Sequence, residues 1–81
     1  MRYSVREIVY PEGDIQEIDW SLRFHQVVDV TGRPLSLPLS TVRMLAYRVC
    51  RVSTEENRNE EITRYHLEQL LPADLREYTE P

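Results

Sequence analysis

The clearest pattern in the chain is an alternation of apolar and polar residues from Ile18 to Val30. Successive residues of a β-strand point to opposite faces of a sheet, so a period of two predicts a strand with one buried side and one side in water. Gln26 interrupts the apolar side, which favours a bulge or bend there, because the segment exceeds the usual strand length. The apolar side consists of Ile18, Trp20, Leu22, Phe24, Val28 and Val30.

Two neighbouring segments also have strand character, and turn sequences separate them from the first. Residues 2–10 are rich in valine, isoleucine and tyrosine and lead into Pro11 and Gly13, which suit a type I turn. After a second turn at Gly32, leucines alternate with serine and proline over 34–39, which is typical of an edge strand. We therefore predict an antiparallel β-meander with strands at about 2–10, 15–30 and 34–39.

The spacing of apolar residues then changes to that of a helix. Over about 41–52 the apolar residues share one helical face and the arginines share the other, and a second apolar stripe covers about 60–71. A strand at 41–52 would place Arg48 and Arg51 on opposite faces, which favours the helix. A short last turn is expected after residue 71, because Pro72 suits the first position of a helix.

These elements predict a small α+β domain of two layers, in which the two C-terminal helices cover the apolar face of the meander. The alternative is a small all-β barrel or roll, in which a third hairpin occupies 44–70 around a polar turn. A chain of 81 residues supports one core. We therefore predict a single domain over 1–81, with 72–81 as a tail that could be loosely attached.

Charge is distributed unevenly along the chain. The net charge at pH 7 is −4, but the acidic residues gather at both ends and the arginines in the middle. On the predicted helix the arginines share a face with an aromatic residue, and such a face could contact phosphates and stack on bases. The candidate contact residues for a partner or a nucleic acid are Arg33, Arg43, Tyr47, Arg48 and Arg51.

The residues carry no catalytic or cofactor signature. Cys50 lies on the apolar face of the predicted helix, and its spacing from His25 and His66 matches no metal site. The two glycines stand singly in turns, so there is no phosphate-binding loop. We predict that the protein is not an enzyme and binds no cofactor or metal.

The size of the chain suggests a use for partners. A core this small leaves a thin margin of stability, which association with another chain would increase. The single cysteine and the lack of a long apolar segment predict a cytoplasmic protein without membrane contact. We expect a protein–protein interaction or assembly module, with a homodimer or another homo-oligomer as one form. The alternative is a nucleic-acid-binding or regulatory protein that uses an arginine-rich helix face, formed by Arg43, Arg48 and Arg51.

Overall fold

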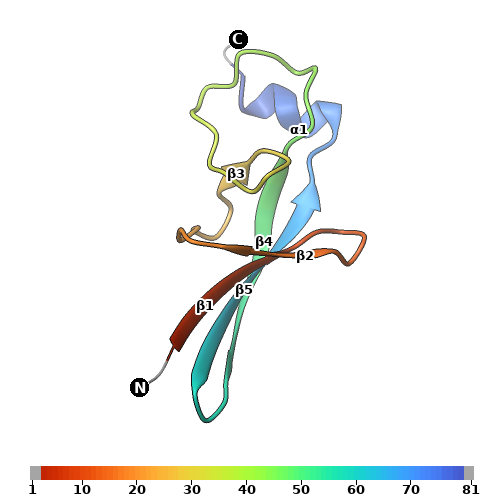
Figure 1. The fold of residues 1–81 in the computed structure, drawn as a ribbon. Coiled ribbons are helices and arrows are strands. Elements are labelled where there is room, and N and C mark those ends of the chain that lie inside the picture. Colours follow the sequence, from red (N-terminus) through yellow and green to blue (C-terminus); the bar gives the residue numbers. More distant parts are fainter. Residues whose placement is uncertain (1–2, 80–81) are drawn as a thin grey trace.

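In the computed structural model, which describes residues 3–79, one curled sheet of five strands forms most of the protein (Figure 1). The strands follow the spatial order β2-β1-β5-β4-β3, and one short helix follows the last strand in the described residues. Within residues 3–79, no helix is long and apolar enough to span a membrane. The elements are β1 (Tyr3–Val9), β2 (Ile15–Ile18), β3 (Val27–Val28), β4 (Tyr47–Glu56), β5 (Glu60–Gln69) and α1 (Pro72–Glu77).

The long hairpin of β4 and β5 is the central unit of the sheet. The two strands pair antiparallel, and β1 lies parallel to β5 along its whole length. At the tip, the backbone N–H of Asn57 donates to the carbonyl of Glu60 at 2.9 Å. The predicted helices at 41–52 and 60–71 are therefore wrong, and so is the two-layer α+β arrangement built on them. The alternative prediction placed a third hairpin at 44–70, and this hairpin is present as β4 and β5. In the described part of the chain the sheet does not close into a barrel, because β2 and β3 form its two open edges.

A β-bulge explains why β4 has the residue spacing of a helix. Arg48 lies opposite Glu68 and Arg51 lies opposite His66, and the register shifts between Val49 and Arg51. Since residues 66 and 68 of β5 face the same side, the two arginines also share a face. One extra residue in a strand shifts its alternation by one position. The three-residue interval between the arginines therefore imitates a helix turn although the backbone is extended.

The predicted strand at 15–30 is also wrong over most of its length. The chain leaves the sheet after Ile18 and returns only for the two residues of β3. A turn intervenes, in which the N–H of Gln26 donates to the carbonyl of Arg23 at 3.1 Å and His25 has φ 67°. Apolar residues of the segment still enter the core, but Phe24 lies on the surface. Alternation thus marked core residues without marking a continuous strand.

Residues 34–39 do not form the predicted third strand. They contribute only isolated bridges, between Val28 and Pro34 and between Leu39 and Thr79. The predictions for the turns and the last helix are confirmed, because chain reversals occur at both glycines and α1 starts at Pro72. The carboxylate of Asp74 accepts a hydrogen bond from the backbone N–H just before the helix, at 2.9 Å, which caps its first turn.

The core consists of two small clusters. The first lies on one face of the sheet and contains Ile8, Tyr10, Ile18, Leu22, Val28, Val49, Tyr65 and Leu67. Trp20 is only partly buried at its margin, where the indole N–H donates to the carbonyl of Gly32 at 3.0 Å. The second cluster joins α1 to the loop between β3 and β4 and contains Val27, Leu39, Ala46, Leu70 and Leu75.

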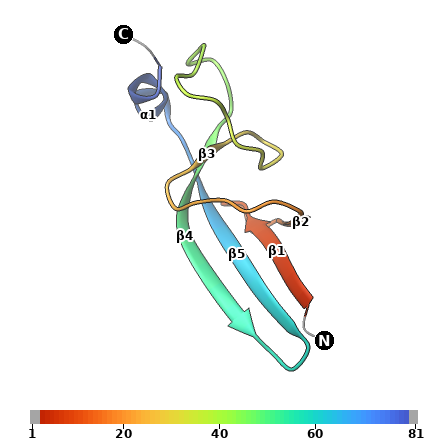
Figure 2. The ribbon, with the colours of Figure 1, turned by 90° about the vertical axis from the view of Figure 1, so that its left-hand side faces the viewer.

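The molecule is elongated. Its principal extents are 49 × 22 × 16 Å, and its radius of gyration is 13.9 Å. A compact chain of this length would have a radius of gyration of about 12 Å. The helix α1 and the loop between β3 and β4, which hold the second cluster, lie at one end, and the far halves of β4 and β5 extend toward the other end together with the start of β1 (Figures 1 and 2).

Candidate functional site

The part of the sheet that extends beyond the core is exposed or half-buried along its whole length. We call it the β-arm and define it as residues 3–5, 50–56 and 60–64 with the turn at 57–59. None of these residues is buried, and no other described element covers either face of the β-arm (Figure 2). The β-arm is held by strand pairing rather than by a core, so both faces and its outer edge are accessible to a partner.

One face of the β-arm carries a row of charged side chains. The guanidinium of Arg64 donates from Nε to Glu7 at 3.0 Å, and its Nη1 donates to Glu55 at 3.5 Å. These contacts raise the pKa of Arg64, with the hydrogen bond to Glu7 as the largest cause. Arg64 thus lies between two carboxylates, which balance its charge on this face.

A histidine lies next to this charged row. Nε2 of His66 is 3.0 Å from Oγ of Ser53 and 3.3 Å from a guanidinium nitrogen of Arg51. Partial burial lowers the pKa of His66, and the positive charges of Arg51 and Arg64 lower it further. Both effects favour the neutral form of the ring.

The serine and histidine resemble the first two members of a hydrolase triad only in their spacing. Such catalysis needs a third group that orients the histidine and a pocket for the substrate. In the described residues no such partner is shown for His66, and the histidine does not line the hollow beside Tyr10 or the one beside Phe24. Cys50 is exposed and its thiol donates to the backbone carbonyl of His66 at 3.3 Å. No group of three or more metal-ligating side chains occurs in residues 3–79.

The outer edge of β4 is the second distinctive feature of the β-arm. Near the core, residues 25–26 cover this edge: the N–H of His25 donates to the carbonyl of Val49 at 2.8 Å, and the N–H of Val49 donates to Gln26 at 3.0 Å. Beyond the bulge the described chain places no strand beside β4 (Figures 1 and 2).

The hydrogen bond at the hairpin tip determines which amides face outward. Alternate pairs of an antiparallel ladder exchange hydrogen bonds. Counting back from the bonded pair of Asn57 and Glu60, Ser53 bonds inward to β5, so the backbone groups of Val52 and Thr54 point away from it. The exposed edge thus presents two sets of backbone donors and acceptors, flanked by the side chains of residues 51 and 55.

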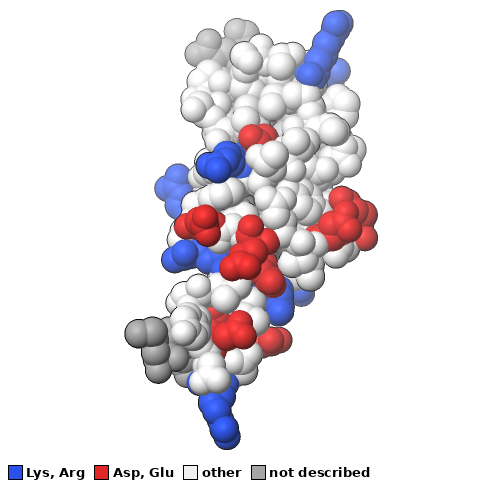
Figure 3. Space-filling view, in the orientation of Figure 1, with Lys and Arg blue, Asp and Glu red and all other residues white. Residues whose placement is uncertain are grey.

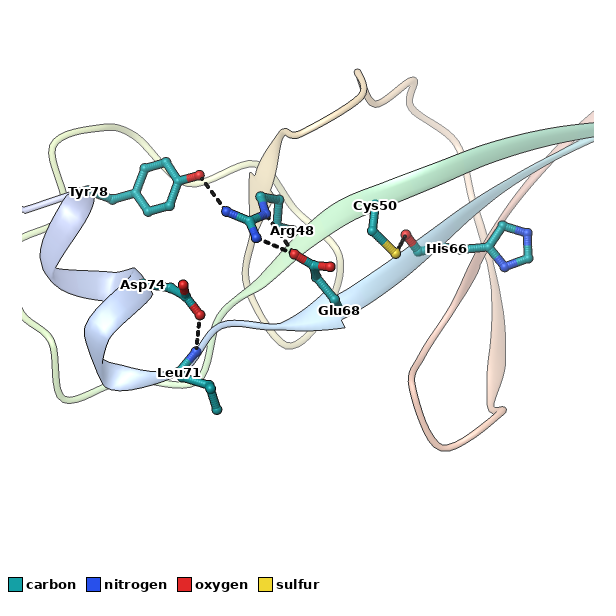
Figure 4. A network of polar contacts seen from close by, with 7 residues as sticks. All are labelled: Arg48, Cys50, His66, Glu68, Leu71, Asp74 and Tyr78. Atoms are coloured by element: carbon teal, nitrogen blue, oxygen red, sulfur yellow. Dashed lines mark hydrogen bonds and ion pairs between the residues drawn. The ribbon is translucent and has the colours of Figure 1, made fainter.

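Arg48, one of the predicted contact residues, is engaged within the fold. Its Nε donates to Glu68 at 2.9 Å and its Nη1 donates to the hydroxyl of Tyr78 at 3.1 Å (Figure 4). The hydrogen bonds with Tyr78 and Glu68 raise the pKa of Arg48. This network connects the end of α1 to the central hairpin, so Arg48 has a structural role.

The other predicted contact residues are dispersed. The guanidinium of Arg33 lies 4.4 Å from the ring centroid of Trp20, and Arg43 lies exposed in the loop before β4. The ring of Tyr47 packs edge-on against Tyr10, with 5.5 Å between centroids. Only Arg51 belongs to the β-arm.

Sequence reasoning missed Val52, Thr54 and Glu55, because Val52 was assigned to the end of a predicted helix and the other two to the connection between the two predicted helices. The available signal was the pair of β-branched positions 52 and 54, which Tyr65 and Thr63 mirror across a polar turn.

Surface charge agrees with the dispersal of the arginines. On the face shown in Figure 3, blue and red side chains alternate along the lower half, and the upper half is mostly uncharged. A phosphate backbone is bound by a continuous basic surface. This face has none.

A shallow apolar groove beside the core is a second exposed surface. Phe24 is 59% exposed and stacks on His25, with 3.8 Å between ring centroids. Leu37, 53% exposed, forms the opposite side. The groove is lined by Arg23, Phe24, His25, Gln26, Val27, Leu35 and Leu37.

Comparison with known proteins identifies one family. A family model described as "Uncharacterised Treponema protein" matches residues 6–78. No curated protein and no solved structure matches the chain. The matched range contains nearly all of the sheet and α1.

Proposed function

The chain belongs to the family described as an uncharacterised Treponema protein, and we propose that it acts as a protein-association module that binds through the outer edge of β4. The observation that carries the proposal is the exposed backbone of Val52 and Thr54 in a β-arm that no described element covers. Exposed strand edges pair readily with other chains, since the main chain supplies the hydrogen bonds and the neighbouring side chains supply selectivity.

The shape of the molecule supports the same proposal. Strands that only stabilised this fold would not need to extend beyond the core, where they bury little apolar surface. Association would cover the β-arm and add burial to a chain whose own core is small.

The nucleic-acid alternative has less support. It required Arg43, Arg48 and Arg51 to share one helix face. Instead, Arg43 lies in a loop, Arg48 is held in an ion pair and Arg51 lies on a strand. The net charge of −4 also opposes binding to a polyanion.

The experiment compares the native chain with Thr54→Pro. Proline removes an outward N–H and projects a ring from the edge, but it leaves the inward hydrogen bonds of β4 intact. Tagged chain is used to recover proteins from its own cells, which also express an untagged copy, and mass spectrometry quantifies what is recovered.

We expect at least one protein, counting the untagged copy, to be retained by the native chain and lost with Thr54→Pro. The matched control is Thr54→Ala, which changes the side chain and keeps the amide; it should behave as the native chain. Thermal unfolding of each variant verifies the fold. If Thr54→Pro recovers the same proteins in the same amounts, the edge is not the binding surface.

A further inference from the structure

We propose that the occupant of the β4 edge is a second copy of this chain, paired antiparallel about Ser53 so that two five-stranded sheets become one. This inference rests on the proposed function and adds to it a partner, a strand direction and a register. Three features of the free edge support it: its limits, the direction of its amides and the order of its charges.

The free edge is short and has a defined centre. Residues 25–26 cover β4 up to Val49, the bulge follows at Cys50, and the hairpin turn begins at Asn57. A partner strand can therefore pair along Arg51–Glu55 without meeting the core or the turn, and the middle of that stretch is Ser53. A two-fold axis through Ser53 would use the whole stretch in both copies.

The outward amides restrict the possible registers. In a continuous antiparallel sheet, paired residues lie on the same face and outward-pointing backbone groups meet one another. Centring the pair on Ser53 places Val52 of each copy opposite Thr54 of the other. Both of these residues direct their N–H and C=O groups outward, so each such pair can exchange two hydrogen bonds.

The charges select this register over its neighbours. With the axis at Ser53, Arg51 of each copy lies opposite Glu55 of the other, and both lie on the charged face of the sheet. Opposite charges in directly opposed positions stabilise a strand pair. An axis at Val52 would place the arginine opposite a serine, and an axis at Thr54 would place it opposite an asparagine. Of these three registers, only the one centred on Ser53 places Arg51 opposite Glu55 in both copies.

The first experiment reverses these charges in the full chain. Sedimentation equilibrium at low salt should show a dimer for the native chain. Arg51→Glu alone and Glu55→Arg alone each oppose like charges twice, so each should weaken the dimer by about tenfold or more. The double variant Arg51→Glu/Glu55→Arg exchanges the two charges and should restore dimerisation to within about threefold.

The control is Glu12→Arg, which makes the same change of charge as Glu55→Arg at an exposed turn outside the β-arm. It should leave the dimer unchanged. A native chain that stays monomeric at all concentrations overturns the inference, and so does a double variant no better than the two single ones.

The second experiment tests the register directly. In a Cys50→Ala background, Ser53→Cys places one thiol on the two-fold axis, in a pair that exchanges no hydrogen bonds and brings the Cα atoms to about 4.5 Å. That separation permits a disulfide. Mild oxidation should therefore convert most of the chain to a covalent dimer, which a non-reducing gel shows.

The matched control is Glu55→Cys in the same background. In the proposed register the two introduced thiols lie four strand positions apart, roughly 13 Å, which is too far for a disulfide. Equal cross-linking at both positions would overturn the register. These results are separable from the proposed function: a monomeric chain whose protein binding is still lost with Thr54→Pro has a foreign partner on the same edge.

Discussion

Gly32 lies against Ile8 with no space for a side chain between them. A Cβ at position 32 would stand 2.4 Å from Cδ1 of Ile8, and the glycine has φ 84°, a conformation that other residues adopt only with strain. Ile8 is fully buried at the centre of the first core cluster. The turn that carries Gly32 therefore packs directly on the core. The indole N–H of Trp20 donates to the carbonyl of Gly32 and so holds the same turn in place.

Gly32→Ala should lower the free energy of unfolding by about 2 to 4 kcal/mol, because backbone strain adds to overpacking. Chemical denaturation measures the change. The control is Gly13→Ala, where φ is 101° and nothing lies within 4 Å of an added Cβ, so that strain acts alone at about 1 kcal/mol.

The clash itself can be isolated with Ile8→Val, which removes the methyl group that an alanine at position 32 would meet. The double variant should be more stable than the sum of the two single changes predicts. Strict additivity would show that the two residues do not interact in this way.

The Arg48 network should stabilise the docking of α1. Tyr78→Phe removes the hydroxyl that accepts from Arg48 and should cost about 1 kcal/mol in unfolding free energy. The N–H of Leu39, which donates to the backbone carbonyl of Tyr78 at 2.7 Å, should exchange faster with solvent. Tyr3→Phe, at a side chain 62% exposed, serves as the control for losing a hydroxyl. Unchanged exchange at Leu39 would mean that the network does not hold the helix.

Protonation of His66 should oppose folding. The folded chain has a lowered pKa at this histidine, chiefly through burial and then through Arg51 and Arg64, so the unfolded chain binds the proton more tightly. The contribution of His66 to stability is complete above about pH 6.5 and decreases as the pH falls toward the folded pKa.

Arg51→Ala should raise the pKa of His66 toward the ordinary value of a histidine without reaching it, since burial, the larger cause of the lowering, remains. An NMR titration of the ring protons measures the shift. Arg43→Ala, which removes an exposed arginine outside the groups that act on this histidine, should leave the titration unchanged. A pKa of His66 that is the same in Arg51→Ala and the native chain would contradict the arrangement.

Local signals in the sequence were reliable where one or two residues decide a conformation. The glycine turns and the helix start at Pro72 depend on backbone preferences that act over a few residues. The first strand, at Tyr3–Val9, also agrees closely with its prediction.

The spacing of apolar residues misled where the chain departs from a regular period. The bulge at Cys50 displaces the arginines of β4 onto one face, and nothing in the residues themselves marks a bulge. Between Ile18 and Val27, alternation reflected residues that reach the core from an irregular segment. The error in the fold carried into the candidate site: Arg43, Tyr47, Arg48 and Arg51 were grouped by a helix that does not exist, and the edge of β4 was overlooked.

The parallel pairing of β1 with β5 also determines the order in which the fold can be completed. Glu7 and Arg64, which join these strands, are separated by 57 positions in the chain. During synthesis β1 and β2 emerge first, and the inner edge of β1 has no neighbour until β5 has been made. Contacts between such distant residues slow folding, because a long loop must close before they form. The nascent β1–β2 hairpin therefore exposes an edge to neighbouring chains, and the last strand of the sheet removes that exposure.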